Sequence, residues 1–175
     1  NFINLPSRIE FENGHVISYL YDADGIKLRT THIIGSDTTV TDYCGNVFYE
    51  NGIPVKLLTE AGYVTLADSK YHYFVQDHLG NNRVVVDQSG NVEEVNHYYP
   101  FGGLLSSSVS NAVQPYKYNG KELDRKNGLD WYDYGARMYD AALGRWHAVD
   151  PMSEKYYSWS PYTYCKNNPV LRIDL

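Results

Sequence analysis

Short runs of β-prone residues recur along this chain, and turn residues separate them roughly every ten to twenty positions. Asn13-Gly14 stands between the runs at 8–11 and 16–19, and Asn51-Gly52 separates two further runs. Asn-Gly is the favoured chemistry for a two-residue hairpin turn, because both residues accept a positive φ. The pattern predicts an all-β chain of consecutive antiparallel hairpins.

A second turn unit, Asp-x-x-Gly followed by β-prone residues, recurs in the first hundred residues. Its copies begin at Asp22, Asp42, Asp77 and Asp87. The aspartate side chain can accept backbone N–H bonds inside such a turn, and the glycine takes the positive φ that other residues resist. This repetition indicates stacked hairpins. The clearest hairpin is predicted where residues 83–86 and 92–95 flank the turn that begins at Asp87.

The hairpin pattern changes after residue 99, where Pro100, two glycines and a run of serines predict a loop. Helix is scarce: residues 133–143 are the best candidate, but Gly135 and the few apolar residues at helical spacing allow at most a short turn or two. We expect three segments, namely a hairpin region at 1–103, a loop or linker at 104–115 and a compact core segment at 116–175.

Tyrosine supplies much of the apolar character of the chain. There are 18 tyrosines against 5 phenylalanines and 3 tryptophans, and 43% of the residues are hydrophobic. Each buried tyrosine carries a hydroxyl that must reach water or a partner. We therefore expect strands that face a wet cavity.

The charge of the chain argues against some classes of binding partner. The formal net charge is −6 and no run of lysine or arginine occurs, which argues against a nucleic-acid or anionic-membrane surface. No apolar run reaches the length of a membrane helix, so membrane insertion is not expected. The chain begins without methionine and lacks the features of a signal peptide. We expect its targeting signal to lie outside this fragment.

The spacing of cysteines and histidines predicts no cofactor. Cys44 and Cys165 form no Cys-x-x-Cys motif, and they leave open either one long-range disulfide or two separate thiols. The six histidines show no His-x-His or His-Glu-x-x-His spacing. A metal site is therefore not predicted.

The last third of the chain is the densest in motifs. Residues 128–140 combine aromatic rings, carboxylates and an arginine, and Leu-Gly-Arg-Trp at 143–146 and Asp150-Pro151 follow. With Tyr-Asn-Gly-Lys-Glu-Leu-Asp at 118–124, this order resembles the core segment of Rhs and YD-repeat proteins, and Tyr21-Asp22 resembles a YD repeat. The resemblance implies a curved sheet of hairpins from a bacterial shell that encapsulates a toxic C-terminal polypeptide.

The resemblance also implies a catalytic site. In the Rhs core, two aspartates and an arginine act like an aspartic protease on the shell's own chain, just past a final Asp-Pro-x-Gly-Leu motif. By motif position Arg137 corresponds to the arginine, Asp150 to the first aspartate and Asp174 to the second. Paired carboxylates can supply acid and base at one pH, and an arginine keeps one of them anionic. Without the resemblance, the residue types alone favour ordinary turn and salt-bridge roles for these three residues.

Two positions depart from the family pattern. Asp150 is followed by Pro-Met-Ser-Glu instead of Pro-x-Gly-Leu, and Asp174 is followed by Leu175. We therefore expect no scissile bond within this sequence. Two alternatives stay open: a truncated copy whose site is vestigial, or a product whose C-terminal end differs from the family's cleavage point. The site is at most a single-turnover aspartic-type autoprotease, because its substrate is its own chain.

The leading hypothesis is a structural fragment of a toxin-encapsulating shell, secreted or on the bacterial cell surface. Its expected partners are the rest of the shell or a C-terminal toxin, and an unpaired sheet edge also predicts self-association. The alternative is a surface adhesion module that binds carbohydrate or protein through its tyrosine-rich strands. The aromatic run at 156–162 could be a sugar-binding surface, but packing against the shell explains these rings more simply. A freestanding hydrolase has little support in the sequence.

Overall fold

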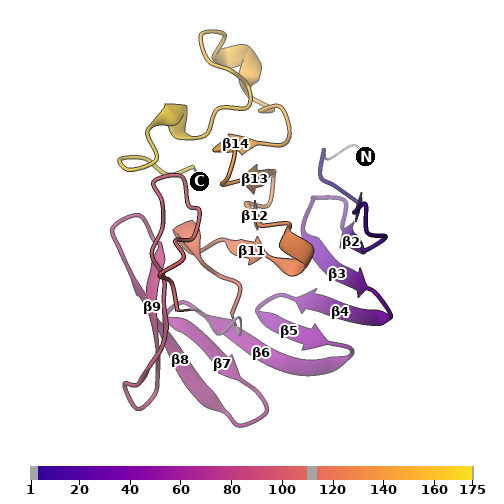
Figure 1. Cartoon of the computed structure of the whole chain (residues 1–175), viewed down its shortest axis with the longest axis vertical. Coiled ribbons are helices and arrows are strands. Elements are labelled where there is room, and N and C mark those ends of the chain that lie inside the picture. The colour runs from indigo at the N-terminus through magenta and orange to yellow at the C-terminus, as the bar shows by residue number, and fades with distance from the viewer. Residues whose placement is uncertain (1–3, 110–113, 175) are drawn as a thin grey trace. The chain divides into compact units, whose positions relative to one another are not determined.

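The computed structural model describes residues 4–109 and 114–174, and almost all of its regular structure is β-strand. The strands of the larger sheet are hydrogen-bonded in chain order, from β1 to β10 (Figure 1). Their bounds are β1 Arg8–Glu10, β2 Val16–Tyr21, β3 Lys27–Ile34, β4 Asp37–Cys44, β5 Val47–Glu50, β6 Ile53–Thr59, β7 Gly62–Thr65, β8 Lys70–Gln76, β9 Asn82–Asp87 and β10 Val92–Val95. This arrangement confirms the predicted all-β fold of consecutive antiparallel hairpins.

The two Asn-Gly turns differ in length. Asn51 and Gly52 have φ values of 51° and 81° and join Glu50 directly to Ile53, so this turn has the two predicted residues. Between β1 and β2 the ladder ends at Glu10 and Val16 instead. The connection there is a longer loop, so the prediction of a two-residue turn was wrong at Asn13-Gly14.

Three of the four Asp-x-x-Gly units form the predicted turn. Asp87 is typical: its Oδ1 accepts the N–H groups of Ser89 and Asn91, each at 2.8 Å. Asp22 and Asp77 accept backbone N–H groups in the same way. Asp42 does not, because it lies inside β4 and binds Arg29 on β3 at 2.5 Å. A cross-strand ion pair has replaced the turn contact at that copy.

A second, smaller sheet has four antiparallel strands in the order β11-β12-β13-β14 (Figure 1). Its strands are β11 Glu122–Asp124, β12 Trp131–Asp133, β13 Met138–Asp140 and β14 Arg145–Trp146. Short 3-10 turns lie around it: η1 Tyr118–Gly120, η2 Lys126–Gly128, η3 Ser153–Lys155 and η4 Cys165–Asn167. Residues 133–143 therefore belong to strands and turns, and the short helix allowed there does not form. Across the described ranges no helix is long and apolar enough to cross a membrane.

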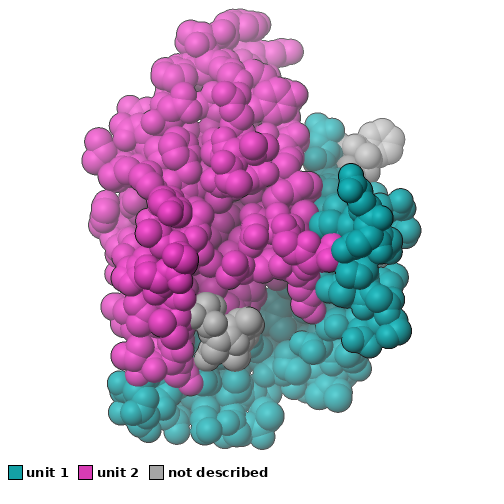
Figure 2. Space-filling model, in the orientation of Figure 1, with its two compact units in different colours: residues 1–73, 86–91 teal, residues 74–85, 92–175 magenta. Residues whose placement is uncertain are grey.

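The chain divides into two compact units (Figure 2). Unit 1 comprises residues 1–73 and 86–91, and unit 2 comprises residues 74–85 and 92–175. Cys44 in unit 1 is exposed, Cys165 in unit 2 is half-buried, and both are free thiols, which agrees with the two-thiol interpretation.

The core of unit 2 is built from tyrosine. Tyr118, Tyr132, Tyr139 and Tyr164 are each at most 2% exposed and pack with Trp146 and Leu123. The hydroxyls of Tyr118, Tyr132 and Tyr139 donate to the backbone carbonyls of the loop at 100–102, at 2.8 to 2.9 Å. The prediction that the tyrosines face a wet cavity is therefore wrong for these three residues, because their hydroxyls donate to backbone carbonyls instead of to water.

Gly102 is required where that loop meets the tyrosine core. Its φ is 91°, and a Cβ there would lie 2.6 Å from Cδ1 of Tyr118. Only glycine combines that backbone conformation with so close an approach of an aromatic ring.

Candidate functional site

Arg137 lies in the tight turn between β12 and β13. The turn is closed by the N–H of Tyr134, which donates to the carbonyl of Arg137 at 3.1 Å, and by Asp133, whose Oδ1 accepts the N–H of Gly135 at 2.7 Å. Met138 directly after it is buried in the core. The turn thus fixes where the guanidinium leaves the sheet.

Both predicted aspartates lie beside this guanidinium. Arg137 Nη2 donates to Asp174 Oδ2 at 3.3 Å, across 37 positions of sequence. Asp150 Oδ2 is 3.8 Å from the same Nη2, within ion-pair range but beyond a hydrogen bond. The structure therefore brings together all three residues that the motif comparison singled out.

The two carboxylates have different surroundings. Asp150 Oδ1 accepts the N–H of Met152 at 2.7 Å in a turn, which leaves Oδ2 to face Arg137. Asp174 makes no such turn contact within the part of the chain that the structure describes. Burial raises the pKa of Asp174, an effect that Arg137 opposes and nearby Asp150 reinforces. Asp174 is therefore the member of the pair that retains a proton to higher pH than an ordinary aspartate.

The guanidinium of Arg137 stacks on the ring of Trp146. Its guanidinium carbon lies 4.2 Å from the ring centroid of Trp146, and its side chain is only 12% exposed. Nη1 is buried and has no hydrogen-bond acceptor among the described residues. A buried guanidinium N–H without an acceptor costs free energy, so Arg137 is held in place at a cost that the rest of the fold must offset.

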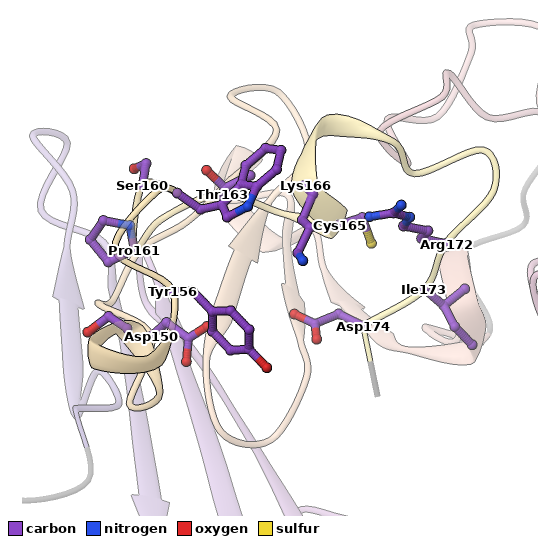
Figure 3. Close-up of a pocket in the computed structure, with 12 residues that line it drawn as sticks. Asp150, Tyr156, Ser160, Pro161, Thr163, Cys165, Lys166, Arg172, Ile173 and Asp174 are labelled. Carbon is purple, nitrogen blue, oxygen red and sulfur yellow. The ribbon is translucent and has the colours of Figure 1, made fainter.

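A pocket of about 280 Å³ opens beside the two carboxylates. Figure 3 shows Asp150 and Asp174 among the side chains that line it, together with Tyr156, Lys166 and Arg172. Lys166 Nζ lies 5.4 Å from the ring centroid of Tyr156 and 5.6 Å from that of Trp159. The pocket thus combines acidic, basic and aromatic groups, as a site for a peptide segment would.

Sequence reasoning missed the residues that support the site. Trp146 was visible as the end of Leu-Gly-Arg-Trp, but nothing in its spacing indicated that it would lie under Arg137. Lys121, whose charge acts on Asp174, gave no signal either, since it is 53 positions away by residue number. Both contacts depend on the folded path of the chain.

Comparison with known protein families matches residues 57–170 to the Teneurin YD-shell. Salivary gland surface protein 1 of Aedes aegypti is 32% identical over 96% of this chain. Toxin subunit YenC1 of Yersinia entomophaga is 28% identical over 77% of it. The chain spans 6% of the first protein and 15% of the second.

Solved structures share the fold. The crystal structure of TcdB2-TccC3-TEV matches 99% of this chain with a TM-score of 0.81 at 19% identity, and that of TcdB2-TccC3 matches 95% with a TM-score of 0.74 at 20% identity. This chain covers 10% of each of those chains. The predicted YD-repeat resemblance is confirmed, and the family match covers well over half of the residues. The chain belongs to the Teneurin YD-shell family, and its role is that of a structural part of such a shell.

Proposed function

We propose that this chain is the closing segment of a YD shell that encapsulates a C-terminal toxin, and that Arg137, Asp150 and Asp174 form its self-cleaving site. Residues 1–103 supply wall hairpins, residues 104–115 join them to the closing segment, and residues 116–175 carry the site. The observation that carries the proposal is the convergence of two distant carboxylates on one guanidinium nitrogen, at 3.3 and 3.8 Å.

The chemistry would be peptide hydrolysis of the aspartic type. The ionised carboxylate takes a proton from water as the water oxygen attacks the peptide carbonyl, and the protonated carboxyl donates to the carbonyl oxygen. Collapse breaks the C–N bond and returns a proton to the leaving nitrogen. The raised pKa of Asp174 favours it as the acid. One chain gives one turnover.

The proposed partners are the rest of the shell and an enclosed polypeptide. Two relatives are named toxin subunits, and another is named a salivary gland surface protein, which supports a secreted or cell-surface location. Strand β1 lies at the end of the larger sheet and pairs with β2. An end strand of this kind can pair with a neighbouring shell strand or with a second copy of the chain.

A tail fusion tests the site. Pro-x-Gly-Leu and a reporter are placed after Asp174, and release of the reporter is followed by intact mass. We expect cleavage in the parent fusion and none in Asp150→Asn or Asp174→Asn. Asp130→Asn is the matched control, because Asp130 is an exposed aspartate that pairs with Arg125 at 2.8 Å, away from the pocket. An intact parent fusion, or cleavage that survives in Asp150→Asn, would overturn the proposal.

A second candidate function rests on the exposed aromatic run. Tyr157 is 88% exposed, and Tyr156 and Trp159 beside it are 50% and 42% exposed. Aromatic faces presented to solvent are typical of protein or carbohydrate binding surfaces. Binding on a glycan array that is lost in Tyr157→Ala would favour this adhesion function, whereas equal binding by the variant would exclude the run as the binding surface.

A further inference from the structure

Unit 2 contains a buried polar cluster that the shell function does not use. Glu94 and Lys117 have side chains that are 1% and 3% exposed, and Lys117 Nζ lies 2.5 Å from Glu94 Oε1. Asn96 and Gln114 complete the cluster at 0% and 2% exposure. Taking two charges out of water costs several kcal/mol per ion before their attraction offsets it, so a pair buried this deeply calls for a reason.

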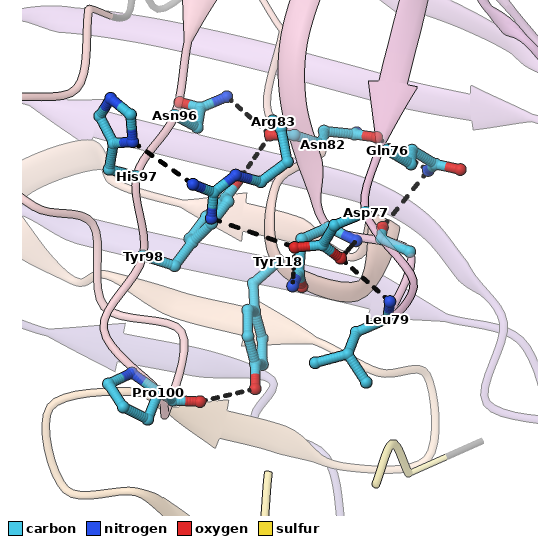
Figure 4. A network of polar contacts seen from close by, with 12 residues as sticks. Gln76, Asp77, Leu79, Asn82, Arg83, Asn96, His97, Tyr98, Pro100 and Tyr118 are labelled. Atoms are coloured by element: carbon cyan, nitrogen blue, oxygen red, sulfur yellow. Dashed lines mark hydrogen bonds and ion pairs between the residues drawn. The ribbon is translucent and has the colours of Figure 1, made fainter. Parts of the chain in front are cut away.

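Strand geometry and a polar network bring these side chains together. Glu94 lies on β10 and Asn96 just beyond it, and residues two apart on a strand share a face. Figure 4 shows the network that orients Asn96: its side-chain amide donates to the carbonyl of Asn82 at 3.0 Å, and its backbone N–H donates to the carbonyl of Arg83 at 2.8 Å. The N–H of Asn82 donates in turn to the carbonyl of Lys117 at 3.0 Å, which fixes the lysine beside the amide.

The hydrogen bonds in the cluster are unevenly distributed. Three donors converge on the single oxygen Glu94 Oε1: the ammonium of Lys117, the amide of Asn96 and, at 2.9 Å, the amide of Gln114. Meanwhile Glu94 Oε2, Asn96 Oδ1 and Gln114 Oε1 are buried and have no donor within the part of the chain that the structure describes. In a buried ion pair with only a structural role, we would expect the donors to be distributed over both carboxylate oxygens of the glutamate.

We propose that Lys117 and Asn96 form an intramolecular isopeptide bond, with Glu94 as the proton carrier between them. One carboxylate oxygen already contacts both the lysine nitrogen and the asparagine amide. Glu94 is therefore within reach of each group that must lose or gain a proton. The reacting groups are held together by the fold, which removes the entropy cost of bringing them into contact.

The atoms balance without a cofactor. Glu94 takes a proton from the Lys117 ammonium, and the free Nζ attacks Cγ of Asn96 to give a tetrahedral centre. Glu94 delivers the proton to Nδ2, and the Cγ–Nδ2 bond breaks to release ammonia. The second proton that Nζ loses passes through Glu94 to this ammonia, which leaves as ammonium, so the neutral mass lost is one ammonia. Burial lowers the pKa of Lys117 against the opposing effect of Glu94, which raises the share of the nucleophilic neutral amine.

Asn96 is favoured over Gln114 as the acyl donor for a geometric reason. Its Nδ2 is held at two points, by Glu94 and by the Asn82 carbonyl, so the leaving nitrogen is fixed next to the proton carrier. The Gln114 amide makes one such contact, to Glu94. Reaction at Asn96 would close a covalent loop from the end of β10 to the start of η1.

Intact mass of the purified chain tests the bond directly. We expect a mass about 17 Da below that of the sequence, the loss of one ammonia, and a branched peptide that joins Asn96 to Lys117 after proteolysis. Lys117→Arg should restore the full mass, whereas the matched control Lys121→Arg should keep the loss. In Asn96→Asp the same bond forms with loss of water, so the deficit becomes about 18 Da. Circular dichroism confirms that each variant is folded.

Three outcomes would overturn the assignment. One is a full-length mass that persists after long incubation at neutral pH. Another is a loss of ammonia without a branched peptide, which indicates a succinimide at some asparagine. The third is a branched peptide that joins Lys117 to Gln114. If Lys117→Arg fails to fold, the test rests on Asn96→Asp alone. In that variant the mass deficit should change from that of one ammonia to that of one water.

Discussion

The two units bury their side chains in different ways. In unit 1 the strands pair over long antiparallel ladders. Large apolar side chains stay exposed in both units, for example Ile53 at 65% in unit 1 and Leu143 at 68% in unit 2. In unit 2 each strand from β11 to β14 has only two or three residues. Four tyrosines of this unit are nevertheless buried almost completely. Unit 1 therefore has the longer backbone ladders, and unit 2 has the cluster of buried tyrosines.

The proposed function accounts for this difference. A wall segment can leave apolar faces for neighbouring strands or an enclosed chain to cover. A segment that positions three site residues needs a rigid core, because Arg137 rests on Trp146, and Trp146 packs against Tyr139 and Tyr164. All three tryptophans, Trp131, Trp146 and Trp159, fall in unit 2, so tryptophan fluorescence reports on unit 2 alone.

Alkaline pH should separate the units most strongly. Burial raises the pKa of Tyr118 to about 12 and raises the pKa values of Tyr132, Tyr139 and Tyr164 as well. A phenol with a raised folded-state pKa stabilises fully below its ordinary pKa and loses that contribution as pH rises to the folded value. For Tyr118 this loss is about 3 kcal/mol between pH 10 and 12.

The measurement is tyrosinate absorbance followed together with tryptophan fluorescence. We expect the core tyrosines to ionise only as the fluorescence of unit 2 shifts to that of exposed tryptophan. Ionisation of all the tyrosines near pH 10 with unchanged fluorescence would contradict a closed tyrosine core.

Gly102→Ala should destabilise unit 2 by about 2–3 kcal/mol, because the new Cβ would meet the Tyr118 ring and φ at this position is 91°. Gly14→Ala in unit 1 is the matched control: its φ is 81° and no atom lies within 4 Å of the added Cβ, so only about 1 kcal/mol of backbone strain is expected. Denaturant midpoints from fluorescence and far-UV circular dichroism measure both. Equal effects of the two variants would mean that the loop at 100–102 is not packed on the core.

Tyr132→Phe should cost about 1–2 kcal/mol, because it leaves the buried carbonyl of Gly102 without its donor while the ring still fits. Tyr71→Phe in unit 1 alters a side chain that is 51% exposed and should change stability by less than about 0.5 kcal/mol. Urea unfolding of both variants checks the pair. A neutral Tyr132→Phe would show that water replaces the lost hydroxyl.

Local chemistry explains what could be predicted from the sequence. Asp-x-x-Gly turns and Asn51-Gly52 are decided by residues within five positions, and most were predicted correctly. Asp42 was predicted wrongly because its partner, Arg29, lies on another strand. Motif order predicted Arg137, Asp150 and Asp174 as candidate site residues, and these three lie close together. The contact of Trp146 with Arg137 and the buried Glu94 cluster depend on contacts between distant segments. Spacing along the chain carries no information about such contacts.

The order of strands in the larger sheet has a kinetic consequence. Each strand from β1 to β10 is hydrogen-bonded next to the strand that precedes it in sequence. Each strand from β2 to β10 can pair with a strand that has already been synthesised, so the entropy cost of closing the loop between the two strands stays small. Such a sheet can assemble vectorially, hairpin upon hairpin, as the polypeptide emerges from a ribosome or a narrow export channel.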